Sequence, residues 1–378
     1  MELIQANPPL LRRLAPLDWA AALLLALGAA YAFRSYGGYM DGYEKAFLVL
    51  AVPTFSWLAW QWSALRNLMG LIALLSLAGI SLYQGDLARA EQVFWLKYFL
   101  SSQTAIGWMC ALFFMATGAF WLGLLARSDF AERTGSALTW TAVLMGFTGM
   151  MVRWYESYLI GTDVGHIPVS NLYEVFVLFS LITALLYLHY ERRYGTRRLG
   201  AFVLLVISAA VGFLLWYTFS RDAQGIQPLV PALQSYWMKI HVPANFIGYG
   251  SFALAAMVGV AWLLQSRGIL ATRLPAPVVL EDVMYKSIAV GFAFFTIATI
   301  LGALWAAEAW GTYWQWDPKE TWALIVWLNY AAWLHMRLTK GLRGAVLAWW
   351  SVSGLVVTSF AFLGVNMFLS GLHSYGSL

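Results

Sequence analysis

The residues best suited to chemistry are histidines and tryptophans near the C-terminal end of the chain. The stretch WGTYWQWDPKETW, residues 310–322, places four tryptophans in thirteen positions. His241 precedes this stretch and His373 follows it. Imidazole is a common axial ligand of haem iron, and aromatic rings stack favourably on flat apolar surfaces. Together these residue types indicate a site for a large flat ligand with a metal at its centre, such as an iron porphyrin.

The stretch itself divides into an aromatic loop and the start of a helix. Asp317 followed by Pro318 is typical of a helix N-cap and first turn, and Glu320 has the spacing of a capping box. Capping is therefore at least part of the role of Asp317. Tryptophans at helix ends are explained by the membrane interface or by packing. That explanation is weaker for Trp310, Trp314 and Trp316, which we place in one loop as a continuous aromatic surface.

The elements that position these residues are predicted to be membrane-spanning helices. Hydrophobic residues make up 61% of the 378 residues and charged residues only 11%, less than half the charge content of a typical soluble domain. No strand-like alternation is present, so the fold class is all-α, a polytopic bundle of about eleven transmembrane helices. The expected spans are 17–34, 44–60, 67–83, 104–126, 138–155, 171–189, 199–219, 242–265, 285–305, 320–337 and 344–369.

The basic residues predict the orientation of these spans. If the N-terminus is cytoplasmic, most of the 23 lysines and arginines fall on the cytoplasmic side, as the positive-inside rule requires. The external loops are then 156–170, 220–241 and 306–319, together with the tail 370–378. His241, His373 and the tryptophan loop therefore share the external face. The basic balance is a topology signal and gives no reason to expect nucleic acid as a partner.

The rest of the chain offers few other candidates for chemistry. Cys110 is the only cysteine, so an internal disulfide or a thiol pair is excluded, and a buried apolar role is expected. The polar segment 84–103 separates three N-terminal spans from the rest. We therefore divide the chain into an accessory three-helix section, 1–100, and a core, 101–378, that carries the tryptophan-rich loop at 306–322.

The three remaining histidines differ in how well they fit a functional role. His335 lies within a span near its cytoplasmic end, and ionisable residues inside a membrane are functional candidates by default. His189 is followed by charged residues, which favours a position facing the lipid headgroups over a ligand role. His166 has no evident function beyond hydrogen bonding.

The segment WGTYWQWDPKETWALIVWLNYAAWLH closely resembles the tryptophan-rich, or WWD, signature of haem-handling membrane proteins. It looks like the CcsA type, also called ResC, of the System II cytochrome c biogenesis pathway. The segment PVSNLYEVFVLFS at 168–180, the segment around His241 and the terminal GLHSYG support the resemblance. It covers the chain from about residue 104 to 378 and leaves the three N-terminal spans unexplained.

The resemblance implies roles for individual residues. It identifies His241 and His373 as the external haem-iron ligands, which also serve the synthase reaction, and His335 as a haem ligand within the membrane. The loop that cradles haem would include Trp310, Trp314, Trp316 and Asp317. A further segment of less defined role contains Asn171, Tyr173 and Glu174.

The resemblance also implies a function, partners and a location. The chain would transport and present haem b, its substrate, within a cytochrome c haem-lyase complex that attaches haem to CxxCH apocytochromes on the outer face of the bacterial inner membrane. Since the chain has no large extramembrane domain of the CcsB (ResB) kind, a separate CcsB-type membrane partner is expected. Two alternatives stay open: a haem exporter or relay without attachment activity, and a secondary transporter of a small solute.

Overall fold

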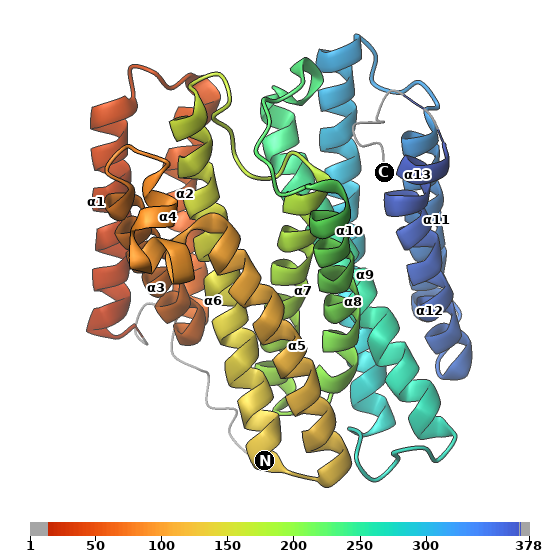
Figure 1. Ribbon diagram of the computed structural model, residues 1–378. Coiled ribbons are helices and arrows are strands. Elements are labelled where there is room, and N and C mark those ends of the chain that lie inside the picture. Colours follow the sequence, from red (N-terminus) through yellow and green to blue (C-terminus); the bar gives the residue numbers. More distant parts are fainter. Residues whose placement is uncertain (1–13, 370, 372–378) are drawn as a thin grey trace. The chain divides into compact units, whose positions relative to one another are not determined.

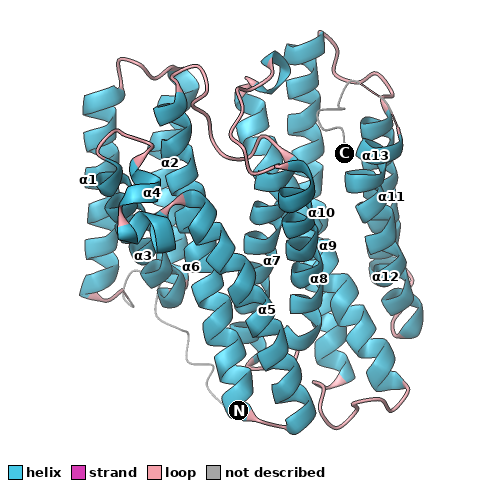
Figure 2. Ribbon diagram, viewed as in Figure 1, coloured by secondary structure: helices cyan, strands magenta, loops and turns pink. Residues whose placement is uncertain are grey.

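The computed structural model describes residues 14–369 and 371, and within them helices and connecting loops make up the whole fold (Figure 2). No strand occurs among these residues, which confirms the all-α class. The chain divides into two compact units, Met1–Ala78 and Gly79–Leu378. The predicted functional division at residue 100 stays a prediction.

The first unit is built from three helices. They are α1 (Pro16–Tyr36), α2 (Gly42–Gln61) and α3 (Ser63–Tyr83), whose C-terminal end continues into the second unit. Arg66 of α3 forms an ion pair with Asp18 in the first turn of α1, and the Trp60 indole of α2 donates to the Asp18 carbonyl at 3.1 Å. These contacts join all three helices at one end of the unit.

The second unit contains the remaining helices. They are α4 (Arg89–Gln92), the π-helix η2 (Leu96–Leu100), α5 (Ser102–Ala126), α6 (Asp129–Ile160), α7 (Leu172–Tyr194), α8 (Gly200–Arg221), the 3₁₀ turn η3 (Pro231–Leu233), α9 (Tyr236–Ser266), α10 (Pro277–Trp310), α11 (Pro318–Thr339), α12 (Ala345–Ser359), the π-helix η4 (Phe360–Gly364) and α13 (Val365–Phe368).

Helix α9 is the central element of the second unit (Figure 1). It packs extensively on α10 and α12 and also contacts α7 and α8. Small residues permit the close approach, because the backbone of Gly259 lies against the carbonyl of Ala348 in α12. Phe252 of α9 stacks on Tyr330 of α11 with ring centroids 3.6 Å apart. The helices that carry the candidate site are thus fixed around one buried helix.

All eleven expected spans are helical. Within the described residues, nine helices are long and apolar enough to cross a membrane. The other two expected spans correspond to α2 and α11, which are helical but fall outside this set of nine. Cys110 is buried in α5, as expected. The last expected span, 344–369, is interrupted by the π-helix η4, which the sequence pattern did not predict.

Candidate functional site

His241 lies in the second turn of α9, at the end of that helix near the tryptophan loop. Its Nδ1 is 2.7 Å from the carbonyl oxygen of Ala298 in α10. A carbonyl oxygen only accepts hydrogen bonds, so Nδ1 must donate, and the neutral ring then carries its lone pair on Nε2. A hydrogen bond through one ring nitrogen that leaves the other as electron donor is typical of metal-binding histidines.

Two residues of α10 set the position of the imidazole. An ideal Cβ at Gly302 would lie 2.9 Å from His241 Cε1, so only glycine allows the ring to approach α10 this closely. The Trp305 ring lies 5.8 Å from the His241 ring, and its indole nitrogen donates to the carbonyl of Ala232 at 2.7 Å. Trp305 also contacts Trp310, with ring centroids 5.5 Å apart. The imidazole therefore begins a continuous row of aromatic rings along α10.

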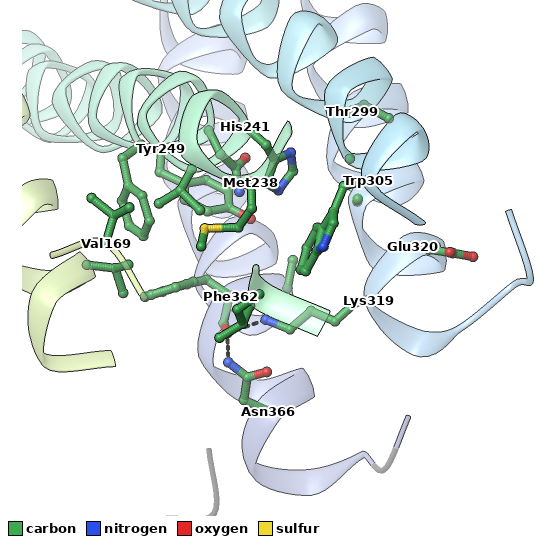
Figure 3. Close-up of a pocket in the computed structure, with 18 of the residues that line it drawn as sticks. Val169, Met238, His241, Tyr249, Thr299, Trp305, Lys319, Glu320, Phe362 and Asn366 are labelled. Carbon is green, nitrogen blue, oxygen red and sulfur yellow. Dashed lines mark hydrogen bonds between the residues drawn. The ribbon is translucent and has the colours of Figure 1, made fainter. Parts of the chain in front are cut away.

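These side chains border a cavity of about 260 Å³ between α7, α9, α10, α11 and η4 (Figure 3). Its lining is mainly apolar and aromatic, and includes Met238, Tyr249, Phe295, Trp305 and Phe362. A smaller number of polar residues line the same space: His241, Ser170, Asn171, Asn245, Thr299, Lys319, Glu320 and Asn366. An apolar, aromatic pocket with a few polar groups is the common form of a site for a small molecule or cofactor.

The tryptophan loop is shorter than predicted. Helix α10 continues to Trp310, and Gly311 ends it with a φ of +79°, a left-handed conformation that favours glycine. The non-helical segment is therefore 311–317, and the remainder of the predicted loop 306–322 is helical. Trp310 is a helical residue, which corrects its placement in the loop proper.

The predicted aromatic surface is only partly continuous. Trp314 and Tyr313 line the cavity. Trp316 is 68% exposed and packs edge-on against Trp314, with ring centroids 5.8 Å apart. Trp305 and Trp314 therefore line the cavity, whereas Trp310 packs against Trp305 and Trp316 packs against Trp314.

Asp317 caps α11 as predicted. Its carboxylate accepts from the backbone N–H of Lys319 at 2.8 Å, and the reciprocal capping box with Glu320 is formed. Asp317 is buried, and the backbone of Gly371 lies directly against its carboxylate. Gly371 therefore lies over the start of α11.

The start of α7 forms another wall of the cavity. Asn171 is the N-cap of α7 and accepts from the backbone N–H of Glu174 at 2.9 Å. Glu174 forms a fully buried ion pair with Arg153 of α6, with an N–O distance of 2.9 Å. The Arg153 guanidinium also lies over the Tyr173 ring, 5.2 Å from its centroid. Tyr173 and Glu174 thus serve to fix α7 to α6, and Asn171, which caps α7, alone of the three lines the cavity.

A further polar cluster lies on the α11 side of the cavity. The Lys319 ammonium donates to the carbonyl of Phe362 at 3.2 Å, and Asn366 Nδ2 donates to the same carbonyl at 3.1 Å. We did not predict Lys319, Asn366 or Arg153 as site residues. Each is a polar side chain within or next to an apolar span, which is the signal that could have identified it.

The structure places two of the predicted haem ligands, His241 and His335, in different regions. His335 is exposed near the C-terminal end of α11. It lies 17 residues beyond Pro318, which corresponds to about 25 Å along the helix axis. It is not part of the cavity that His241 lines. His373 lies outside the described residues, so its approach to His241 stays a prediction.

The other two histidines do not line the cavity. His189 is exposed on α7, in keeping with a headgroup-facing position. His166 is buried, with Nδ1 donating to the Val164 carbonyl at 2.6 Å and Nε2 2.9 Å from the Ser170 hydroxyl. His166 therefore helps to hold the loop before α7, next to the cavity wall.

Comparison with known proteins decides the family. The model of the family described as cytochrome c assembly protein matches residues 169–373, which include all the residues that line the cavity. The cytochrome c biogenesis protein CcsA of a Synechococcus species is 33% identical, over 82% of this chain and 99% of its own length. The chain belongs to the CcsA family of cytochrome c biogenesis proteins. The CcsA protein of Parasynechococcus marenigrum is 35% identical, over 68% of this chain and 94% of its own.

A solved structure shares the fold of the CcsA chain. The cytochrome c haem lyase CcmF superposes with a TM-score of 0.53 at 19% identity, over 70% of this chain and 48% of the lyase chain. At this identity the likeness concerns the fold alone. The two chains therefore share an overall arrangement of helices over the matched part of this chain.

Proposed function

We propose that this chain binds haem b as a substrate in the cavity beside the tryptophan loop and presents it to apocytochrome c for attachment. Membership of the CcsA family gives the chain a role in cytochrome c maturation and places it in a membrane. The observation that carries the finer proposal is the geometry of His241. Its ring is held by Ala298, Gly302 and Trp305 at the wall of an aromatic cavity, with Nε2 as the electron-donating atom.

The chain's contribution to the reaction would be positioning. His241 would bind one face of the haem iron and His373 the other, while Trp305 and Trp314 lie along the ring. The histidine of a CxxCH segment would then replace one of these ligands and bring the two cysteine thiols to the vinyl groups. Each thiol adds across one vinyl double bond, so nothing leaves. Holding reactants in a productive geometry can lower a barrier by about 7–11 kcal/mol.

The remaining parts of the proposal concern the route of haem and its partners. His335, exposed near the far end of α11, would bind haem within the membrane together with a histidine of a CcsB-type partner. The complex of the two proteins would act as the haem lyase. It would lie in the bacterial inner membrane, with the N-terminus in the cytoplasm and the cavity opening outward.

The test is a haem spectrum of the chain co-purified with its partner. We expect the absorption bands of bis-histidine haem, and loss of both the bands and cytochrome c maturation in His241→Ala. Added imidazole should restore part of each, because it replaces the missing ligand. His189→Ala, an exposed histidine away from the cavity, is the matched control and should behave as wild type. Unchanged maturation in His241→Ala would refute the proposal, and haem binding without attachment would indicate a relay.

A further inference from the structure

We propose that Lys319 binds a carboxylate side chain of the haem, one of its two propionates, and thereby fixes the orientation of the ring in the cavity. This inference rests on the proposed function. It assigns a role to a residue that lies opposite His241, on the α11 side of the same cavity (Figure 3).

The first observation is the placement of the ammonium group. The Lys319 side chain runs from the first turn of α11 across to η4, where Nζ donates to the carbonyl of Phe362. It contacts the Phe362 ring as well, 5.7 Å from its centroid. An ammonium group has three N–H donors, and this carbonyl is the one hydrogen-bond acceptor that it reaches among the described residues. The group therefore retains donors for a ligand.

The second observation is the balance of charge around Lys319. No carboxylate of the described residues lies within ion-pair distance of Nζ. The nearby acidic residues are committed to backbone groups: Asp317 accepts from the N–H of Lys319, and Glu320 accepts from the N–H groups of Gln315 and Asp317. The Glu320 carboxylate also points away from the Lys319 side chain (Figure 3). A cation in an apolar cavity is costly unless an anion accompanies it, so the site favours an anionic ligand.

The third observation is the geometry of η4. A π-helix is rare and often marks a functional position. Here the turn presents the carbonyl of Phe362, which accepts from both Lys319 and Asn366. This shared acceptor holds the lysine at the cavity wall. Asn366 Nδ2 lies beside it as a further donor group.

The chemistry of the substrate fits this arrangement. Haem b is apolar and flat, with both propionates on one edge and the two vinyl groups on other edges. An ion pair between Lys319 and a propionate would place the carboxylate edge at α11 and η4. The vinyl groups, where the thiols add, would then face away from α11. Lys319 would therefore determine which edge of the ring an apocytochrome can reach.

The experiment compares two ligands that differ in their carboxylates alone. Iron protoporphyrin IX and its dimethyl ester are titrated into the full-length chain in detergent, and binding is followed by the haem absorption band. Loss of one charge-assisted hydrogen bond corresponds to roughly a 10- to 100-fold change in affinity. We expect wild type to prefer the free acid by that factor, Lys319→Gln to lose the preference, and Lys319→Arg to keep most of it.

Controls separate the failure of this proposal from failure of the proposed function. Lys340→Gln removes the same charge at the far end of α11 and should leave the preference intact. If wild type binds neither ligand, the proposed function fails. If wild type binds both ligands with equal affinity, haem binding stands but Lys319 has no such role. The same conclusion follows if Lys319→Gln binds both ligands with the affinity that wild type has for the free acid. Equal weakening of both ligands in Lys319→Gln would show that the lysine only holds η4 in place and would overturn the proposal.

Discussion

At the scale of single residues, His241 is positioned by atoms that are not ligands themselves. The carbonyl of Ala298 selects the ring tautomer, and the absence of a side chain at Gly302 lets the ring lie against α10. The Trp305 ring packs against the His241 ring, and its indole nitrogen donates a hydrogen bond to the Ala232 carbonyl. Metal-binding histidines depend on such supporting contacts nearly as much as on the donor atom.

Gly302→Ala is therefore expected to weaken haem binding while the chain still folds. The added methyl group would lie 2.9 Å from His241 Cε1 and 3.1 Å from Nδ1, so the ring must shift and its hydrogen bond to Ala298 must lengthen. We expect at least a tenfold loss of haem affinity, in line with the roughly 10- to 100-fold cost of losing such supporting contacts. The haem titration measures it. Gly212→Ala in α8, where a Cβ would meet open space, should bind as wild type. If Gly302→Ala binds haem with the affinity of wild type, a shift of the His241 ring does not impair haem binding and the prediction is wrong.

The sequence identified part of this site for clear physical reasons. Asp317, Pro318 and Glu320 were predicted to start α11 because capping depends on local spacing, and the structure confirms it. Lys319 and Arg153 were missed, because their roles depend on which helices meet. No local pattern shows that Lys319 reaches Phe362, 43 residues later in the chain.

At the scale of elements, one buried ion pair joins α6, α7 and the loop that follows α8. Arg153 contacts Glu174 at 2.9 Å and also donates to the carbonyl of Gln224 at 2.8 Å. Glu174 in turn accepts from the backbone N–H of Ser170, in the segment that lines the cavity. This network sets the position of the α7 wall relative to the rest of the second unit.

Glu174→Gln should therefore destabilise the chain strongly. It removes the charge that balances Arg153, and an uncompensated buried charge costs about 3–5 kcal/mol. Thermal unfolding in detergent would show a clear fall in midpoint. Arg133→Gln, which breaks the exposed pair with Asp129, is the matched control and should change stability by about 1 kcal/mol or less. If Glu174→Gln lowers the unfolding midpoint as little as Arg133→Gln does, the prediction is wrong and water must reach the Arg153 guanidinium.

The elements themselves could be predicted better than their irregularities. Long apolar segments predicted where the helices lie, because membrane spans are defined by length and hydrophobicity, although α6 begins nine residues and α10 eight residues before the expected span. The extension of α10 to Trp310 and the π-turn η4 were not predicted. Aromatic residues fit both loops and helices, and a π-turn depends on contacts such as those of Phe362 with α11 rather than on composition.

At the scale of the whole molecule, the proposed function requires the cavity to open to the outside. The distribution of basic residues predicts this orientation, and it also predicts that the loop after α11 faces the cytoplasm. Thr312 in the tryptophan loop and Lys340 after α11 are exposed and lie at opposite ends of that helix. If α11 crosses the membrane, as the sequence predicts, these two positions report opposite sides of it.

Single cysteines placed at these positions test the orientation directly. Cys110, the one native cysteine, is buried in α5 and should react little with a membrane-impermeant maleimide. In intact cells or right-side-out vesicles, Thr312→Cys should be labelled and Lys340→Cys protected, and disruption of the membrane should expose both. The Cys110→Ala background without an added cysteine gives the baseline. The reverse pattern would place the cavity on the cytoplasmic side, where apocytochromes awaiting haem attachment at the outer face could not reach the bound ring.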